Sequence, residues 1–426
     1  MSSVKAWRNG VVTAYAGSGL VFASWVSRLP AIKDDLGLTP GTVGLMLLCM
    51  SLGSFISVGA SGLVVLRLGS KLTTRLGSLI QSTGIITLAL GATVFASPIV
   101  VGAGLVIVGL GTGSWNAASN IEGAAVERAL GRHIMPRLHG SFSIGTVVGA
   151  GLGALAASIN LPVAIHLSAV AVLVFAAVWI GAGYYQADQR SADAYLVDTG
   201  TPATTQKGSD SSASDKSKAK LDGKAKIAAA WRDPRTLMLG VLVLGLGLAE
   251  GAAGDWVALA MVDGYGAEQE MGAIGYGIFV SAMTIGRFAG TVVLDKYGRV
   301  IVLRISAATA VLGLGLFVFA PNQEIALAAL VLWGLGSALG FPVAMSAASD
   351  DPEHAAARVS VVSTVGYGAF LGGPPLLGLL AEHVGVLHAL LAVLVLLVVA
   401  FFLTPVVRRP KYLDAAAKPA AASVDV

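Results

Sequence analysis

Hydrophobic residues in this chain of 426 residues gather into long runs that are nearly free of charge. Each run is about 20 residues long, enough for a helix rising about 1.5 Å per residue to cross roughly 30 Å of hydrocarbon. Inside such runs only a helix satisfies its own backbone, and the alternation of a membrane β-barrel is absent. The pattern predicts an all-α polytopic membrane protein with twelve spans, near residues 11–27, 41–65, 76–96, 99–121, 140–158, 163–184, 237–261, 272–294, 301–320, 325–346, 360–381 and 385–407.

The second half of the pattern repeats the first. Ser24-Trp25-Val26 recurs as Asp255-Trp256-Val257, and Val43-Gly44-Leu45 recurs at the same spacing as Ile274-Gly275-Tyr276. Duplication in so apolar a chain is typical of transporters that rock one half against the other. We predict two pseudo-symmetric six-helix bundles, a disordered cytoplasmic linker between them and a cytoplasmic tail, with the boundaries 1–185, 186–235, 236–410 and 411–426.

Composition agrees with a membrane protein, and charge predicts its orientation. The chain is 55% hydrophobic and 12% charged, with a mean hydropathy of +0.78, far outside the range of soluble proteins. Nearly all of the 28 Lys and Arg residues fall in the termini, the linker and the even-numbered loops; the exceptions are Arg28, Lys33 and Arg287. We therefore expect both termini in the cytoplasm and the chain in the inner membrane. The net charge of +4 then reflects membrane insertion, and no nucleic-acid partner is expected.

The sequence contains no catalytic constellation. Its lone cysteine, Cys49, excludes intramolecular disulfides and thiolate metal clusters. The glycines of Gly109-x-Gly111-x-Gly113 lie in an apolar helix with no strand before them, which favours packing over nucleotide binding. We expect no enzymatic activity, no cofactor and no metal site.

Two loop segments at matching positions of the halves carry a further pattern. They read Gly62-x-x-x-Leu66-Arg67-x-Gly69-x-Lys71 and Asp295-Lys296-x-Gly298-Arg299, and they look like the two copies of the loop motif of the major facilitator superfamily. With Trp115-Asn116, Asn120 and Glu250-Gly-Ala-x-x-Asp255-Trp256, the chain resembles the little-characterised YbjJ-like bacterial branch, which is distantly similar to fucose permeases. The resemblance implies a secondary transporter with a midplane cavity and a cytoplasmic gate at Arg67, Gly69, Lys71, Asp295, Lys296, Gly298 and Arg299.

Two positions depart from the family pattern. The loop motif normally has an aspartate where Leu66 stands, an acid that in relatives holds neighbouring helix ends together in the outward-open state, so here only Asp295 can do this. Asn116 stands where an acid is expected in helix 4. Because an amide carries no proton, no proton coupling is expected through Asn116.

Glu250 and Arg287 are charged residues inside predicted spans. An ionised carboxylate there costs several kcal/mol unless it is paired, so Glu250 is a candidate proton carrier. Counting along the helices leaves a direct pair with Arg287 stretched but within reach. A static ion pair is the alternative interpretation.

The candidate cavity residues are polar or aromatic side chains within the spans. Each also has a structural interpretation: interhelical hydrogen bonding for the amides, interfacial anchoring for the tryptophans, which is favoured for Trp256, and packing for the tyrosines. Asp255 is expected at the outer mouth or as a helix cap. The set is Asn116, Asn120, Trp115, Asp255, Trp256, Tyr276 and Tyr367.

Stripes of small residues are a second candidate feature. Gly145, Gly149 and Gly153 share one face of helix 5, and Gly368 and Gly372 share one face of helix 11. In the superfamily these helices border the interface between the halves, so the stripes are sliding seams or sites of static close packing.

The sequence therefore predicts a monomeric secondary transporter that moves a small polar or amphipathic organic solute across the bilayer by alternating access, coupled to H⁺ through Glu250. An uncoupled facilitator and a non-transporting sensor or scaffold on the same fold are the alternatives.

Overall fold

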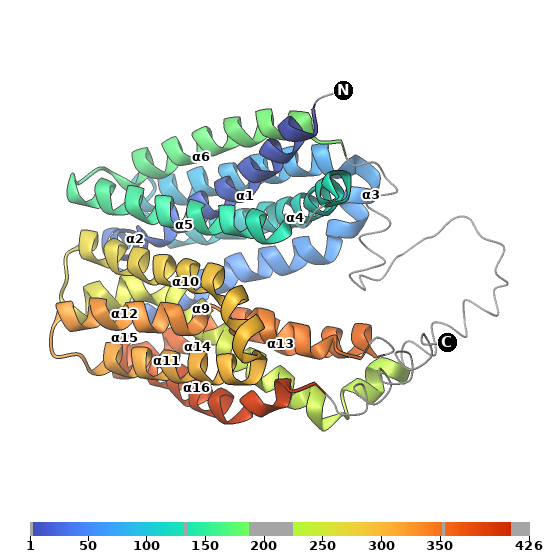
Figure 1. The fold of residues 1–426 in the computed structure, drawn as a ribbon. Helices are drawn as coiled ribbons and strands as arrows, with labels where there is room; N and C mark the ends of the chain where they lie inside the picture. The colour runs from blue at the N-terminus through green and yellow to red at the C-terminus, as the bar shows by residue number, and fades with distance from the viewer. Residues whose placement is uncertain (1–2, 132–133, 187–224, 352–353, 410–426) are drawn as a thin grey trace, which may run out of the picture.

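The computed structural model describes residues 3–131, 134–186, 225–351 and 354–409, and these residues form helices and no strand (Figure 1). The first half contains α1 (Val4–Val26), α2 (Leu29–Leu36), α3 (Pro40–Thr93), α4 (Pro98–Leu130), α5 (Met135–Ser158), α6 (Val163–Gly181) and η1 (Ala182–Tyr184). The second half contains α9 (Pro234–Leu259), η2 (Ala260–Gly264), α10 (Gln269–Tyr297), α11 (Arg299–Phe319), α12 (Gln323–Ser337), α13 (Gly340–Ala348), α14 (Ala355–Val384), α15 (Val386–Ala389), α16 (Leu391–Leu403) and η3 (Thr404–Val407).

Within the described residues, 11 helices are long and apolar enough to cross a membrane. One of them, α3, is 54 residues long and includes two predicted spans, 41–65 and 76–96, on either side of a non-helical Gly69. Every predicted span therefore corresponds to helical structure, with 325–346 divided between α12 and α13 and 385–407 among α15, α16 and η3. The all-α fold with two six-helix bundles is confirmed, although most of the predicted linker and the whole predicted tail lie outside the described residues.

Matching glycines turn the chain after the second and eighth spans. Gly69 has φ 74° and ψ 159°, and Gly298, between α10 and α11, has φ 73° and ψ 157°. A residue with a Cβ is strained in this region, so both turns require glycine. The same backbone conformation at corresponding loops is a structural trace of the duplication.

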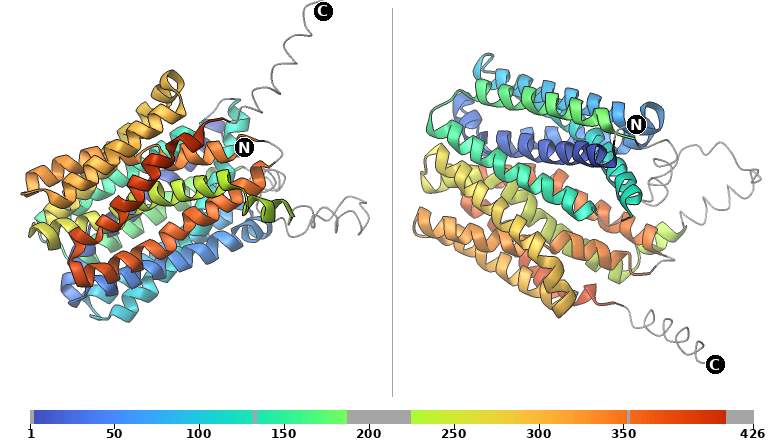
Figure 2. Two further views of the ribbon diagram at one scale, coloured as in Figure 1. Left: turned by 90° about the horizontal axis from the view of Figure 1, so that it is seen from below. Right: turned by 45° about the horizontal axis from the view of Figure 1, so that its top comes forward.

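The helices of each half pack mainly against one another. In the first half α1 packs on α5 and α6, and α3 packs on α4; in the second half α9 packs on α14 and α16, and α11 on α12. The halves meet most extensively through α5 with α10 and α3 with α14, and α1 and α2 add smaller contacts with the second half. The start of α1, η1, the start of α9 and η3 lie at one end of the bundle, which we call the terminal end; the opposite end is the distal end (Figures 1 and 2).

The glycine stripe of α5 faces α1 within its own half. A Cβ added to Gly145 would lie 2.1 Å from the carbonyl oxygen of Ala16, and one added to Gly149 would lie 2.4 Å from that of Leu20. The prediction of a sliding seam on this stripe is therefore wrong, and close packing against α1 accounts for it. On α14, a Cβ at Gly368 would meet no atom within 4 Å, so this glycine marks no close approach.

Other glycines bring the two halves together at the distal end. A Cβ on Gly44 of α3 would lie 2.6 Å from the carbonyl oxygen of Pro374 and 3.1 Å from the Cα of Gly378, both on α14. A Cβ on Gly378 would lie 2.7 Å from the carbonyl oxygen of Pro40. Two backbones of different halves are thus in direct contact, which only glycine permits.

Candidate functional site

Glu250 of α9 and Arg287 of α10 form an ion pair inside the membrane-spanning part of the second half. The Arg287 Nη2 group donates to Glu250 Oε1 at 2.6 Å. The Glu250 and Arg287 side chains remain 25% and 32% exposed, so the pair is only partly buried by the protein. The Nε of Arg287 is buried and has no hydrogen-bond partner among the described residues, so the guanidinium keeps donors in reserve.

On the first half, the two amides of α4 bond to α1. Tyr15 donates its hydroxyl to Asn120 Oδ1 at 2.5 Å, and Ser18 donates to Asn116 Oδ1 at 3.2 Å. Asn120 also donates to the carbonyl oxygen of Asn116 at 2.9 Å. The amides therefore take part in interhelical hydrogen bonding, yet the Asn116 side chain is exposed and can still donate to a solute.

His139 of α5 lies near this polar group. The sequence did not indicate that His139 and the α4 amides are close together. Its ring meets the Tyr15 ring edge-on with centroids 5.2 Å apart, and it is exposed. It also interacts electrostatically with Arg287 of the other half. His139 and Arg287 therefore lie within electrostatic range of each other across the interface between the halves.

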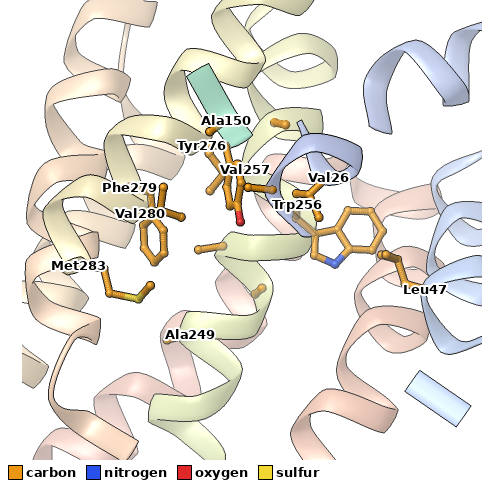
Figure 3. Packing of buried hydrophobic residues seen from close by; sticks show 14 of the residues in the cluster. Val26, Leu47, Ala150, Ala249, Trp256, Val257, Tyr276, Phe279, Val280 and Met283 are labelled. Atoms are coloured by element: carbon orange, nitrogen blue, oxygen red, sulfur yellow. The ribbon is translucent and has the colours of Figure 1, made fainter. Parts of the chain in front are cut away.

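The aromatic candidates divide into buried and exposed residues. Trp115, Trp256 and Tyr276 are each 1% exposed, whereas Tyr367 is 54% exposed. Trp256 lies beside Val26 and Leu47 of the first half (Figure 3). The anchor interpretation of Trp256 is wrong, because its indole fills the closed distal interface and is not displayed at the membrane surface. The three buried rings do not line an accessible cavity in this conformation, and Tyr367 stays a candidate.

Asp255 is half-buried on α9 and makes no hydrogen bond or ion pair within the described part of the chain. Tyr276 of α10 interacts electrostatically with both Asp255 and Glu250. The two carboxyl groups therefore share one neighbourhood, and Asp255 does not cap its helix, since α9 continues past it to Leu259.

The expected gate residues of the first half are exposed at the terminal end. Arg67 and Lys71 flank Gly69, and Lys71 donates to the carbonyl oxygen of Gly183 in the same half at 2.9 Å. Leu66, where the family has an acid, packs against a small cluster of Val65, Ala118 and Ile121. These contacts do not reach the second half.

In the second half, the expected gate residues also stay within their own bundle. Asp295 is exposed, and no ion pair of it is present among the described residues. Lys296 lies over the ring of Tyr297, 5.2 Å from its centroid. Arg299 follows Gly298 and donates twice to Asp350, at 2.8 and 2.5 Å. Asp350 also accepts from Arg235 at 3.0 Å, which ties the start of α9 to the start of α11.

Glu122 is a buried acid that the predicted spans did not include. This residue is fully buried in α4, and its carboxylate accepts hydrogen bonds from the Trp7 indole and the Ser70 hydroxyl, the latter directly after Gly69. The predicted span ended at residue 121, but α4 continues to Leu130. An acid inside a span is a signal that a longer predicted helix would have captured.

Polar contacts join the halves at the distal end. Lys33, at the end of the first span, pairs with Asp263 of η2 at 3.0 Å, and the Gln269 amide donates to Asp34 at 3.3 Å. Thr39 donates to Glu382 of α14 at 2.5 Å. Together with the Gly44 and Gly378 contact, these interactions close the distal end.

Breaking the Lys33–Asp263 pair is expected to loosen this closure modestly. The side chains are 16% and 21% exposed, so the pair is worth about 1 kcal/mol, roughly a fivefold change in population. In a Cys49→Ser background, Lys33→Gln should raise maleimide labelling of a Leu47→Cys probe by about that factor. Lys71→Gln, which removes a bond within one half, is the control. Equal labelling in both variants would show that the pair does not hold the distal end closed.

Comparison with known proteins agrees with this architecture. The sequence profile described as Major Facilitator Superfamily matches residues 11–373 and, in a second match, 256–424. The chain is 29% identical over 398 residues to the uncharacterized transporter y4wD of Sinorhizobium fredii, covering 91% of this chain and 97% of the relative. It is 28% identical over 382 residues to the membrane protein MosC of Rhizobium meliloti, covering 88% and 84% of the two chains.

Solved structures share the fold at low sequence identity. A point mutant of the nucleoside transporter NupG superposes with a TM-score of 0.74 at 14% identity, covering 94% of this chain and 99% of that one. A point mutant of the fucose:proton symporter FucP of E. coli gives a TM-score of 0.57 at 15% identity, covering 94% and 98%. At these identities the likeness establishes the arrangement of helices.

Proposed function

The chain belongs to the major facilitator superfamily and is a membrane transporter rather than an enzyme, and we propose that it carries a small polar or amphipathic organic solute together with a proton. The observation that carries the proposal is the Glu250–Arg287 ion pair, which lies within membrane-spanning helices and is only partly buried by the protein. Intramembrane charges are costly and mark ion and substrate pathways.

Protonation of Glu250 is the coupling step. A proton on the carboxylate removes its charge and releases Arg287, whose unused donors then turn to acceptor atoms of the solute. When the solute leaves, Arg287 attracts the ionised Glu250 again and the proton departs. Proton and solute binding thus favour each other. Protonation of Glu250 frees Arg287 for the solute, and a solute bound to Arg287 takes the place of the ionised carboxylate.

The solute-binding groups of the first half are Asn116, Asn120, Tyr15 and His139. They offer amide, hydroxyl and imidazole donors and acceptors opposite the ion pair, which suits hydrogen-bonding solutes. Tyr367 of α14 adds an exposed aromatic edge. This combination supports a solute with several hydroxyl or amide groups.

Orientation follows from the basic residues, which gather at the terminal end. By the positive-inside rule this end faces the cytoplasm of an inner-membrane protein. The closed distal end then faces outward, so this conformation is closed to the outside. The proposed gate role of Asp295 agrees with this conformation. An acid that holds the cytoplasmic helix ends together in the outward-open state is expected to have no partner when the outer side is closed.

Proton uptake in proteoliposomes tests the proposal. The solute is first identified by comparing metabolites of deletion and overexpression strains. The wild-type protein should take up protons when solute is added, whereas Glu250→Gln, which imitates the protonated form, should exchange solute without moving protons. Glu268→Gln, a change of the same kind at an exposed site before α10, is the control and should behave like the wild type.

A Glu250→Gln variant that still moves protons with solute would remove this residue from coupling. A wild-type protein that moves solute without protons would favour an uncoupled facilitator. The sensor or scaffold alternative predicts no solute exchange by any variant.

A further inference from the structure

An apolar groove lies between the two halves, at the seam of α5 and α10. Its volume is about 490 Å³, within the range of small-molecule sites. Gly151 and Ala154 line it from α5, Gly277 and Ile285 from α10, and Leu335 from α12. Apart from the hydroxyl of Ser281, the side chains that line it are aliphatic.

The groove opens toward the bilayer. Gly277 lies eight residues after the start of α10, and Trp256 lies eight residues before the end of η2, which continues α9. At about 1.5 Å per residue, both are therefore about 12 Å from the distal end. At that depth the interior between the halves is filled by Trp256 with Val26 and Leu47 (Figure 3). The exposed side of the groove therefore faces the lipid around the bundle, where α10 lies between α5 and α12 (Figure 1).

The surfaces beside the groove are those of lipid-facing helices. On α5, Ile144, Val148 and Leu152 are 56%, 46% and 36% exposed; on α10, Ile285 is 62% exposed. No charged side chain lines the groove. Its occupant must therefore be apolar and come from the hydrocarbon layer that surrounds these helices.

We propose that the groove between α5 and α10 holds one acyl chain of a membrane phospholipid, which acts as a ligand of the distal-closed state. The groove continues the α5–α10 interface, so an occupant touches both halves at once. Movement of one half against the other changes the shape of the groove. The acyl chain binds most tightly to the conformation whose groove matches its shape. Lipid composition then shifts the balance between the states by differential affinity.

Photocrosslinking tests the site with a phosphatidylethanolamine whose acyl chain carries a diazirine. In proteoliposomes, crosslinks should concentrate on residues 147–154 and 274–285, above the level at Phe402, a 70% exposed residue of α16 that reports ordinary lipid contact. Gly151→Phe should abolish the excess. A Cβ at Gly151 meets no atom within 4 Å, so the new ring enters the groove without disturbing the fold.

The matched control is Gly315→Phe on α11, where a Cβ also meets no atom within 4 Å. It should leave the crosslinks unchanged. Even labelling of all exposed apolar residues, or an excess that persists in Gly151→Phe, would overturn the lipid site. Labelling that an added small alkane displaces but phospholipid does not would also overturn it, because the occupant would then be a small apolar solute.

The effect of the bound lipid on conformation rests on the proposed alternating access and is measured separately. Spin labels at Leu68→Cys and Tyr297→Cys, both exposed at the terminal end, report the separation of the halves in a Cys49→Ser background. Transfer from detergent to lipid nanodiscs should shift the distances toward the distal-closed state, and Gly151→Phe should reproduce that shift in detergent. If crosslinks form at the groove but the spin-label distances do not shift, the lipid binds there without controlling the conformation, which contradicts the proposed effect. A loss of proton coupling in Glu250→Gln affects neither readout, so the two proposals fail separately.

Discussion

Replacing Asp350 with asparagine is expected to destabilise the second half by about 2–3 kcal/mol. Its carboxylate is the shared partner of Arg235 and Arg299, and its side chain is only 9% exposed. Neutralising it leaves two arginines facing each other with one amide between them, and breaking a buried pair costs about 3–5 kcal/mol. The arginines are 20% and 23% exposed, so water recovers part of this cost.

The measurement is the midpoint of thermal unfolding of the purified protein in detergent. Asp34→Asn is the control: its carboxylate is 46% exposed and lies 3.7 Å from Lys33, so its loss should cost no more than about 1 kcal/mol. Similar midpoints for the two variants would show that Asp350 does not hold α9 and α11 together.

Gly44→Val is expected to prevent closure of the distal end. The added side chain meets the carbonyl oxygen of Pro374 and the Cα of Gly378, and backbone atoms cannot rotate out of the way. The halves must then separate at this point, while the packing within each half is unaffected. Solute transport should be lost, and a Leu47→Cys probe should become fully accessible to maleimide from the distal side.

Gly59→Val on the same helix is the matched control, because a Cβ there meets no atom within 4 Å. It should retain transport and a protected probe. A protected probe in Gly44→Val would mean that the distal end closes without this backbone contact. A large drop in the unfolding midpoint of Gly44→Val would instead mean that the contact is needed for stability.

The helical spans and the duplication could be read from the sequence because both depend on local or periodic patterns. A run of apolar residues predicts a span wherever it packs, and the repeat predicts that the halves are related. The turn at Gly69 is also local, since its backbone angles require glycine. The charges within the spans, Glu250 and Arg287, were visible for the same reason.

Contacts between distant segments could not be read in this way. Lys33 and Asp263 are 230 positions apart, and their pairing depends on how the halves meet. The glycine stripe of α5 gives the spacing of small residues but not the helix that they face. Trp256 occurs near a helix end in the sequence, and its burial follows from the closure of the distal end, which no local pattern specifies. Glu122 was not predicted because the expected span ended at residue 121, whereas α4 continues to Leu130.

The indole of Trp256 implies that distal closure is held back as well as favoured. Its Nε1 is buried in the interface and has no hydrogen-bond partner among the described residues. A buried donor without a partner costs about 1–3 kcal/mol, a cost that hydration would remove once the interface opens. Part of the gain from packing the ring is thereby cancelled in the closed state alone. The free energies of the distal-closed and distal-open conformations are thereby brought closer. Solute and proton binding then have to supply less free energy to shift the equilibrium between them.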